Sequence, residues 1–428
     1  MQTSGVSVTL MVNSILLPEN LPRIVRRNTI LLSTGQVVLT TSTQITVIIG
    51  ALATFQLSGD PSLSGLVFSL TWAGRILVSY ASGFLMDKMG RKPVLLLGGI
   101  LTMLTMVMLG FFVLTKNLFG MLAAFLIYGI GTAILNQNRV AIADMYSDSK
   151  MGSAVGYLYT SSIIGALIAV PFVAAVEPLS QSLGINEYAL LWIAGAAILL
   201  ATIATTLMIK PDTKEIANLV RSNPIHTNNL ELGNSLPLKS AGIISSFVVS
   251  ALSSGIMVAM MSLLSLHMSQ HNVPVTLITI AVTIHIIGMF AFSLPFGRMV
   301  DRIGAKKIMI VGSTITGLGG LITPLSTDYF IATFGIFLVG VGWSATAVST
   351  TALISSLTAP SLRGRTLGLN DMLIGGASIT APFAGGVVIG AYGFFAFGLY
   401  GFLLSIPAIM AASLLKTARP EILPHRRN

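Results

Sequence analysis

Three charged residues stand inside long apolar runs of this 428-residue sequence, namely Arg75, Arg139 and Asp371. A charge in surroundings as apolar as a lipid bilayer costs roughly 2.5–3.5 kcal/mol on insertion scales, so such a residue is a functional hypothesis by default. Asp371 is the only carboxylate well inside an apolar run. Because the proton affinity of a carboxyl group changes with its surroundings, Asp371 is the leading candidate for a proton carrier.

Arg139 shares one side of a predicted helix with two uncharged polar residues. Thr132, Asn136 and Arg139 follow the three- to four-residue spacing of a single helical face. Such a face could form a polar wall against an anionic or polar solute. Two structural alternatives stay open, because the Arg139 side chain could extend to the lipid headgroups or pair with Asp144.

Further uncharged polar residues lie inside other apolar runs. Gln36, Thr40 and Gln44 recur at every fourth position, so they share one helical face that needs water, a solute or another helix opposite it. His285, near the middle of a run, could relay protons or bind a solute, or it could only hydrogen-bond a neighbouring helix. Trp343 is a weaker candidate for the wall of a site.

The sequence does not predict an enzyme. It contains no cysteine, its five histidines are scattered, and no nucleophile–base pair or metal-ligand spacing is present. The phosphate-binding pattern G-x-x-x-x-G-K-[ST] is also missing, so no ATP site of that kind is predicted. We therefore expect neither a metal nor a cofactor.

The elements that must position these residues are membrane-spanning helices. Only 9% of the residues are charged and 54% are hydrophobic, whereas a soluble domain carries about 25% charged residues. Apolar runs of about 20 residues are long enough to cross a bilayer, and in lipid they must be helical to satisfy their own backbone. The twelve predicted spans are Leu31–Phe55, Leu63–Met86, Pro93–Leu114, Leu118–Asp144, Gly152–Val176, Tyr188–Ile209, Ala241–His267, Val275–Pro295, Ile308–Leu325, Tyr329–Leu357, Gly364–Ile389 and Phe394–Leu415.

The basic residues predict the orientation of these spans. If both termini are cytoplasmic, all of the 24 Lys and Arg residues except Arg75, Lys116 and Arg139 fall in cytoplasmic segments. This is the distribution of the positive-inside rule. The net charge of +10 therefore indicates topology and contact with anionic lipid, and no nucleic-acid partner is expected. The absence of cysteine and of an N-x-S/T site fits a prokaryotic inner (plasma) membrane.

An internal repeat divides the chain in two. The glycine, acidic and basic positions of residues 83–92 recur at 297–306, at an offset of 214. Gly152 and Gly156 match Gly364 and Gly368 at an offset of 212, and a Gly-x-Gly pair at 129 matches another at 340. Two parallel six-helix halves related by an axis along the membrane normal are a transporter plan with a central binding site.

The repeated loop resembles the signature G-x-x-x-D-R/K-x-G-R-R/K of the major facilitator superfamily. The first copy supplies Gly83, Asp87, Lys88, Gly90, Arg91 and Lys92. The second copy supplies Gly297, Asp301, Arg302 and Gly304, with Ala305 where arginine is common. With twelve predicted spans around it, the resemblance extends over nearly the whole chain.

The resemblance implies an all-α membrane protein of twelve transmembrane helices in two pseudo-symmetric halves. In the family this loop acts as a latch of the cytoplasmic side, and Asp87 would contact the eleventh helix near Gly364. The second and eleventh helices pack together, so we expect Arg75 and Asp371 to pair in at least one state, either as a moving contact or as a fixed structural pair. The implied units are an N-terminal lead (1–27), a first half (28–209), a linker (210–239), a second half (240–416) and a tail (417–428).

The resulting functional hypothesis is an alternating-access secondary transporter of a small organic solute. Protons are the candidate coupling ion, with Asp371 as their carrier, and the protein is expected to act as a monomer in the bilayer. An uncoupled facilitator is the close alternative, because one carboxylate is slender support for coupling. A non-transporting membrane sensor with the same fold is a more distant one.

Overall fold

The computed structural model describes residues 20–59, 63, 66–222, 236–270, 273, 275–325 and 328–415. Over these residues the secondary structure is helical, without a strand. The predicted N-terminal lead up to residue 19, residues 223–235 of the predicted linker and the predicted tail at 417–428 lie outside the described residues.

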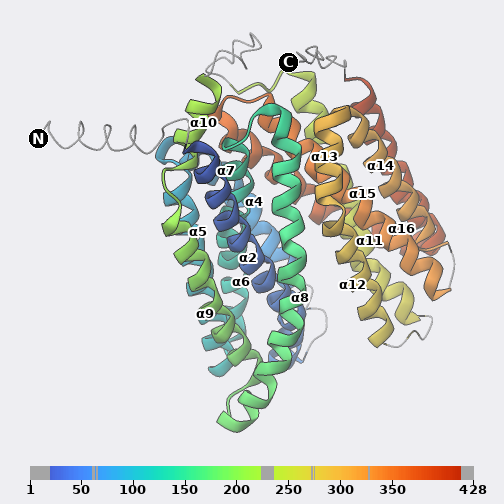
Figure 1. Cartoon of the computed structure of the whole chain (residues 1–428). Helices are drawn as coiled ribbons and strands as arrows, with labels where there is room; N and C mark the ends of the chain where they lie inside the picture. Colours follow the sequence, from blue (N-terminus) through green and yellow to red (C-terminus); the bar gives the residue numbers. More distant parts are fainter. Residues whose placement is uncertain are drawn as a thin grey trace, which may run out of the picture.

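The helices form two groups that follow the chain (Figure 1). The first group is α2 (Leu21–Ser58), α4 (Leu66–Met89), α5 (Arg91–Leu114), α6 (Leu118–Asn136), α7 (Asn138–Asp144), α8 (Met151–Leu183) and α9 (Glu187–Met208), with the short 3-10 helix η1 (Asp148–Lys150) before α8. The second group is α11 (Ala241–Gln270), α12 (Val275–Ala291), α13 (Ser293–Ile303), α14 (Ala305–Ile322), α15 (Tyr329–Ser356) and α16 (Pro360–Ser413). Between the groups, α10 (Thr213–Ser222) lies at one end of the bundle.

Nine helical stretches among the described residues are long and apolar enough to cross a membrane. The longest, α16, contains two predicted spans, because Gly393 (φ 78°, ψ 179°) is non-helical and separates them. Neither α2 nor α4 is among the nine.

Three of the differences from the predicted spans bear on the first helix and on the segments that carry the polar residues. The first helix begins at Leu21 and not at Leu31, with Pro22 in its first turn, where the missing amide of a proline has no cost. The fourth predicted span is divided at Gln137 into α6 and α7. The eighth is divided at Phe292, so that Asp301 is carried on a separate helix, α13.

The two groups of helices meet mainly through α4 against α16 and α8 against α13. Glycines make these contacts close. A Cβ atom added at Gly83 would collide with the carbonyl of Gly364, and one added at Gly297 would collide with the carbonyl of Gly152. We call the end of the bundle that contains these four glycines the closed end.

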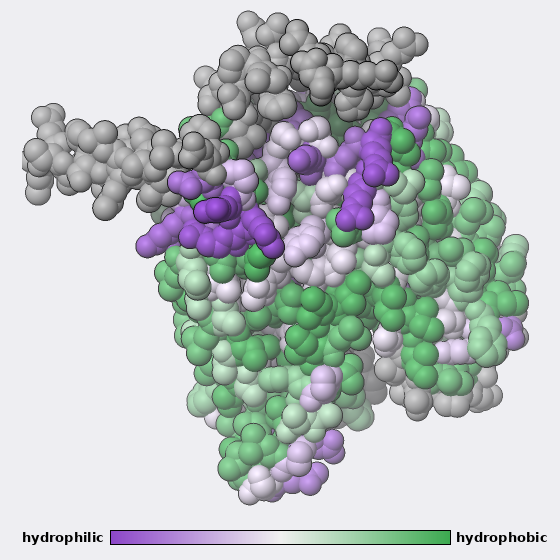
Figure 2. Space-filling view, viewed as in Figure 1, coloured by the Kyte–Doolittle hydropathy of each residue, from purple (hydrophilic) through white to green (hydrophobic). Residues whose placement is uncertain are grey.

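Away from the closed end the two groups diverge. In Figure 2 polar residues gather near the closed end, the flanks below it are apolar, and a notch separates the lower ends of the two groups. The next close contacts along the same helices, Gly368 against Ser79 and Gly156 against Ser293, also belong to the closed end. The halves are therefore joined at one end and open at the other.

The helix α10 is attached across the closed end, although the sequence predicted only a polar linker there. Asp212, just before it, accepts the backbone amides of Arg91 and Lys92 at 3.1 and 2.9 Å. Lys214 Nζ donates to the carbonyl of Asp87 at 2.5 Å, and the side chain of Ile216 is fully buried. The linker thus begins as an ordered element that packs against α5, α7 and α16.

Candidate functional site

The charges inside the bundle meet where α7 of the first half lies against α16 of the second. Arg139 forms an ion pair with Asp371, and their side chains are 7% and 20% exposed. Gln137 Nε2 donates to the second carboxylate oxygen at 3.2 Å, and Arg139 also donates to the carbonyl of Leu367 at 3.4 Å. A carboxylate of one half is thus held by two side chains of the other.

The break between α6 and α7 puts these side chains in place. The backbone amide of Gln137 donates to the carbonyl of Ile134 at 3.1 Å. This acceptor is three residues earlier in the chain and not four, as in a regular α-helix, so the turn is tighter. Three consecutive polar residues, Gln137, Asn138 and Arg139, are then buried, because α7 is enclosed by α2, α5, α8, α15 and α16. Asn136, the residue that we expected on this wall, is only half-buried and lies outside the network.

A chain of hydrogen bonds continues from α7 into the first half. Asn138 Nδ2 donates to Gln36 Oε1 at 2.6 Å. Gln36 Nε2 donates in turn to Ser162 Oγ at 2.9 Å and to Thr40 Oγ1 at 3.4 Å. Two residues of the predicted polar stripe therefore face another helix, whereas Gln44 is half-buried and outside this chain.

The expected pair of Arg75 and Asp371 is not formed in this state. The guanidinium of Arg75 lies over the ring of Trp72, with its central carbon 4.9 Å from the ring centroid. Its neighbour Arg139 takes the carboxylate, because α7 holds Arg139 directly against α16. Both alternatives considered for Arg139 are also wrong here, since the side chain is buried and Asp144 is bound by Arg91 and by Arg363.

Aromatic rings connect the two halves beside this pair. Trp343 on α15 lies 6.2 Å, centroid to centroid, from Tyr159 on α8 of the other half, and 6.1 Å from Phe290. Its indole Nε1 donates to Ser254 Oγ at 3.2 Å. Tyr159 also interacts with Arg139, so the rings and the ion pair form one region.

His285 lies apart from this region. Its ring is fully buried between α12 and α15, and Nδ1 is 2.7 Å from the carbonyl oxygen of Ile336. A Cβ atom at Gly340 would come within 3.1 Å of the same Nδ1. This close packing favours the helix–helix interpretation of His285 over a role in proton relay or solute binding.

The first copy of the loop motif forms a charged network at the closed end. Asp87 accepts the backbone amides of Gly364 and Arg365 at 3.0 and 2.9 Å, the contact that the family resemblance implies. Arg91 bonds Asp87 at 3.0 Å and Asp144 at 2.7 Å, and the side chain of Arg365 adds a longer contact of 3.3 Å to Asp87.

The second copy is built from fewer charges. Asp301 accepts the backbone amides of Gly152 and Ser153 at 2.8 Å each, and the Ser153 hydroxyl also donates to it. These amides belong to the first turn of α8, where amide groups lack helical partners. Among the described residues, no ion pair of Asp301 with a basic side chain is present.

The remaining motif residues serve the turn or point outward. Gly90 and Gly304 have φ values of 95° and 86°, a region that residues with side chains rarely adopt, so both turns need glycine. Lys88 and Arg302 are exposed. Lys92 donates to the carbonyls of Leu207 and Ile209, at 2.7 and 3.1 Å.

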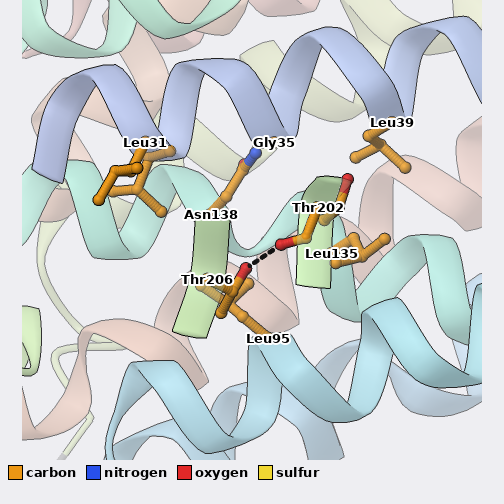
Figure 3. A pocket seen from close by; sticks show the side chains of 9 residues that line it. Leu31, Gly35, Leu39, Leu95, Leu135, Asn138, Thr202 and Thr206 are labelled. Atoms are coloured by element: carbon orange, nitrogen blue, oxygen red, sulfur yellow. Dashed lines mark hydrogen bonds between the residues drawn. The ribbon is translucent and has the colours of Figure 1, made fainter. Parts of the chain in front are cut away.

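A small pocket also lies within the first half, with an empty volume of about 270 Å³ that includes open space. Figure 3 shows Asn138 reaching toward α2 from its wall, and Thr206 donating to the carbonyl of Thr202 at 2.7 Å. Its other walls are mostly leucine, and neither Arg139 nor Asp371 lines it. The pocket is therefore separate from the candidate site.

Some residues of the site were missed by sequence reasoning. Gln137 and Asn138 contribute more than Asn136, and Tyr159 and Trp72 were not candidates for the site. The available signal was the run of three amides at 136–138 in an otherwise apolar segment. The sequence could not show which of the three would turn inward, because the break in the helix decides it.

Comparison with known proteins agrees with this architecture. The sequence matches the model of the Major Facilitator Superfamily over residues 32–269 and 242–427. It is similar to the uncharacterized MFS-type transporter YdeG of Bacillus subtilis, 27% identical over 402 residues that cover 91% of this chain and 92% of the relative. It is also similar to the riboflavin transporter RfnT of Brucella anthropi, 24% identical over 377 residues, 86% of this chain and 90% of the relative.

A solved structure has the same fold. The proton:xylose symporter XylE superposes with a TM-score of 0.72 at 14% identity, covering 90% of this chain and 95% of that one. The chain therefore belongs to the major facilitator superfamily. It is a multi-pass membrane protein and a secondary transporter.

Proposed function

We propose that this protein is an alternating-access transporter that moves a small organic solute across the membrane with a proton, and that Asp371 carries the proton. The observation that carries the proposal is the ion pair of Asp371 with Arg139. It links α16 to α7 and so connects the two halves. A proton added to Asp371 removes its charge and weakens that link, so proton binding and the arrangement of the halves become coupled.

The orientation belongs to the same proposal. Twelve spans with both termini in the cytoplasm would place the basic residues of the closed end, such as Arg91 and Arg365, on the cytoplasmic side. The opposite end, where the halves diverge, would then face outward. The structure would represent an outward-open state, held shut inside by the contacts of Asp87 and Asp301.

The transport cycle follows from these contacts. When the solute and the proton are bound, the link between Asp371 and Arg139 weakens, the glycine contacts of the closed end separate, and the site opens to the cytoplasm. A lone chain contains every residue of the site, so we propose that it works as a monomer. Its relatives named above are bacterial proteins, which supports a bacterial plasma membrane as its location.

The solutes named for similar proteins support an organic solute for this protein. One relative is named as a riboflavin transporter, and a protein of the same fold is named as a proton:xylose symporter. Riboflavin and xylose differ in size and polarity, so these names support the class of solute and leave its identity to experiment.

Proton flux in proteoliposomes tests the proposal. The purified protein, with a pH dye inside the vesicles, is challenged with panels of drugs, amino acids, organic acids, sugars and nucleosides. We expect one class of compound to change the internal pH, and Asp371→Asn to abolish the change. Glu177→Gln is the matched control, because Glu177 is an exposed carboxylate at the far end of α8.

The sign of the pH change separates symport from antiport. If a labelled compound equilibrates across the membrane but the internal pH never changes, the uncoupled facilitator replaces the proposal. If Asp371→Asn retains full gradient-driven transport, Asp371 is not the proton carrier.

A further inference from the structure

The charges of the candidate site do not balance. Between the halves near the middle of the bundle, the described charged side chains are Arg75, Arg139 and Asp371. Arg139 and Asp371 form the ion pair, which leaves the charge of Arg75 without a counter-ion. A charge inside a membrane-spanning segment normally pairs with another group, and a site with a net positive charge attracts a negative ligand.

The position of Arg75 on its helix directs it toward the interior. On α4, Gly74 packs against the backbone of Leu126 in α6, while Ile76 packs against Gly375 in α16. At 100° per residue, residue 75 lies between these two faces. Leu77, further round the helix, is 68% exposed and marks the lipid side, so Arg75 points between α6 and α16.

The neighbours of Arg75 confirm this direction and leave its donors free. Asp371, Arg139 and Tyr128 all act electrostatically on the guanidinium. Its Nε is buried without a hydrogen-bond partner, and no hydrogen bond from its side chain exists among the residues that the structure describes. The face of the guanidinium rests on Trp72, which leaves the N–H edge available for a planar, two-point contact.

We propose that the solute is an organic anion and that Arg75 binds its negatively charged group. This inference rests on the proposed function, because it concerns the same site. A carboxylate fits the N–H edge of Arg75, and its charge balances the site. The rings of Trp72, Tyr159 and Trp343 supply surfaces for the body of such a molecule, so an anion with a flat apolar part matches the site.

Charge-matched probes test the inference. We would measure binding of 2-naphthoate, 2-naphthamide and 2-naphthylmethylammonium to the full-length protein in lipid nanodiscs at pH 7, together with benzoate and octanoate and their amides. We expect at least one carboxylate to bind tenfold or more tightly than its amide, and the ammonium probe to bind more weakly than either.

Variants identify the residue responsible. Arg75→Gln should reduce the preference for the carboxylate to about one, and Arg75→Lys should retain part of it because the charge remains. Lys116→Gln is the matched control, since Lys116 is an exposed cation outside the site, and it should keep the wild-type preference. Unchanged binding of the amide probes by Arg75→Gln shows that this variant is folded.

In the binding assay, the inference would be overturned by equal or tighter binding of an amide than of its carboxylate to the wild-type protein. A full carboxylate preference in Arg75→Gln, or no binding of any carboxylate, would also overturn it. Failure of the proposed function has a different signature. If solutes cross proteoliposome membranes regardless of their charge, the transporter proposal stands and the anion inference fails. If no solute crosses, the transporter proposal fails, and the binding results still decide the inference.

Discussion

Asp87 and Asp301 occupy equivalent positions in the two copies of the loop motif, yet their surroundings differ. Asp87 is buried and has backbone amides and two arginines as partners. Asp301 is half-buried, and its partners in the described part of the chain are two amides and a hydroxyl of the first turn of α8. One contact between the halves therefore depends on a charge network, and the other on a helix N-terminus.

The origin of the difference lies in a second acidic residue. Arg91 joins Asp87 to Asp144, and Asp144 also binds Arg363 of the other half at 2.5 Å. The repeat offsets of 211–214 place the counterpart of Asp144 at 355–358, where the sequence is Ser-Ser-Leu-Thr. The second copy has Ala305 in place of the arginine and no counterpart of the second acid, Asp144. The sequence motif is therefore preserved, but the charge network around it is not.

The largest effect should come from filling a glycine contact. A side chain at Gly364 would meet Asp87 Oδ1 at 2.8 Å and the carbonyl of Gly83, so Gly364→Val should reduce the closed population at least tenfold. Spin labels at Met89→Cys and Ile303→Cys, exposed on opposite halves, would measure the distance across the closed end in a chain free of other cysteines. Gly376→Val is the control, because its Cβ would meet nothing within 4 Å, and an equal effect of the two would contradict the prediction.

Asp87→Asn should have the second-largest effect on the closed end. Removal of one partner from a buried ion pair costs about 3–5 kcal/mol. Here Arg365 loses the charge of Asp87, and Arg91 keeps only that of Asp144. We expect transport to fall more than tenfold and the same label distance to lengthen. Retention of the wild-type distance would show that the amides of α16 do not need a charged acceptor.

Asp301→Asn should have a smaller effect than Asp87→Asn. The asparagine keeps one oxygen for one amide of α8 and presents a donor to the other, at a cost of about 1–3 kcal/mol. Transport should fall two- to tenfold in the same vesicle assay. If this variant were as damaging as Asp87→Asn, the two copies would be equivalent in energy and the comparison above would be wrong.

Ala305→Arg should have the smallest effect on the stability of the closed state. It restores the arginine of the motif in the second copy, but no second acid lies at the position that corresponds to Asp144. The stability of the closed state should change less than in Asp301→Asn, because the substitution removes none of the hydrogen bonds that Asp301 makes to α8. A clear gain in thermal stability would show that Asp301 alone is sufficient to recruit the new charge.

The sequence predicted the general architecture because its signals are local. Apolar length anticipated the helical segments, and the family resemblance of the repeated loop implied the contact of Asp87 with Gly364. The sequence analysis expected Arg75 as the partner of Asp371 and did not anticipate Arg139, because that pairing depends on the break in the helix at Gln137. The helix α10 was missed because its short apolar side is stabilised by burial of Ile216 against the bundle, which is a tertiary effect.

The ion pair inside the bundle also constrains how the protein is made. Arg139 and Asp371 are 232 positions apart in the chain, so the segment that carries the arginine leaves the ribosome long before the segment that carries the aspartate. The first half must enter the bilayer with an uncompensated charge on α7, at an insertion cost of roughly 2.5–3.5 kcal/mol. The arrival of α16 offsets that cost, because Asp371 then pairs with Arg139. One of the last helices to be synthesised therefore completes the packing of α7, which belongs to the fourth predicted span.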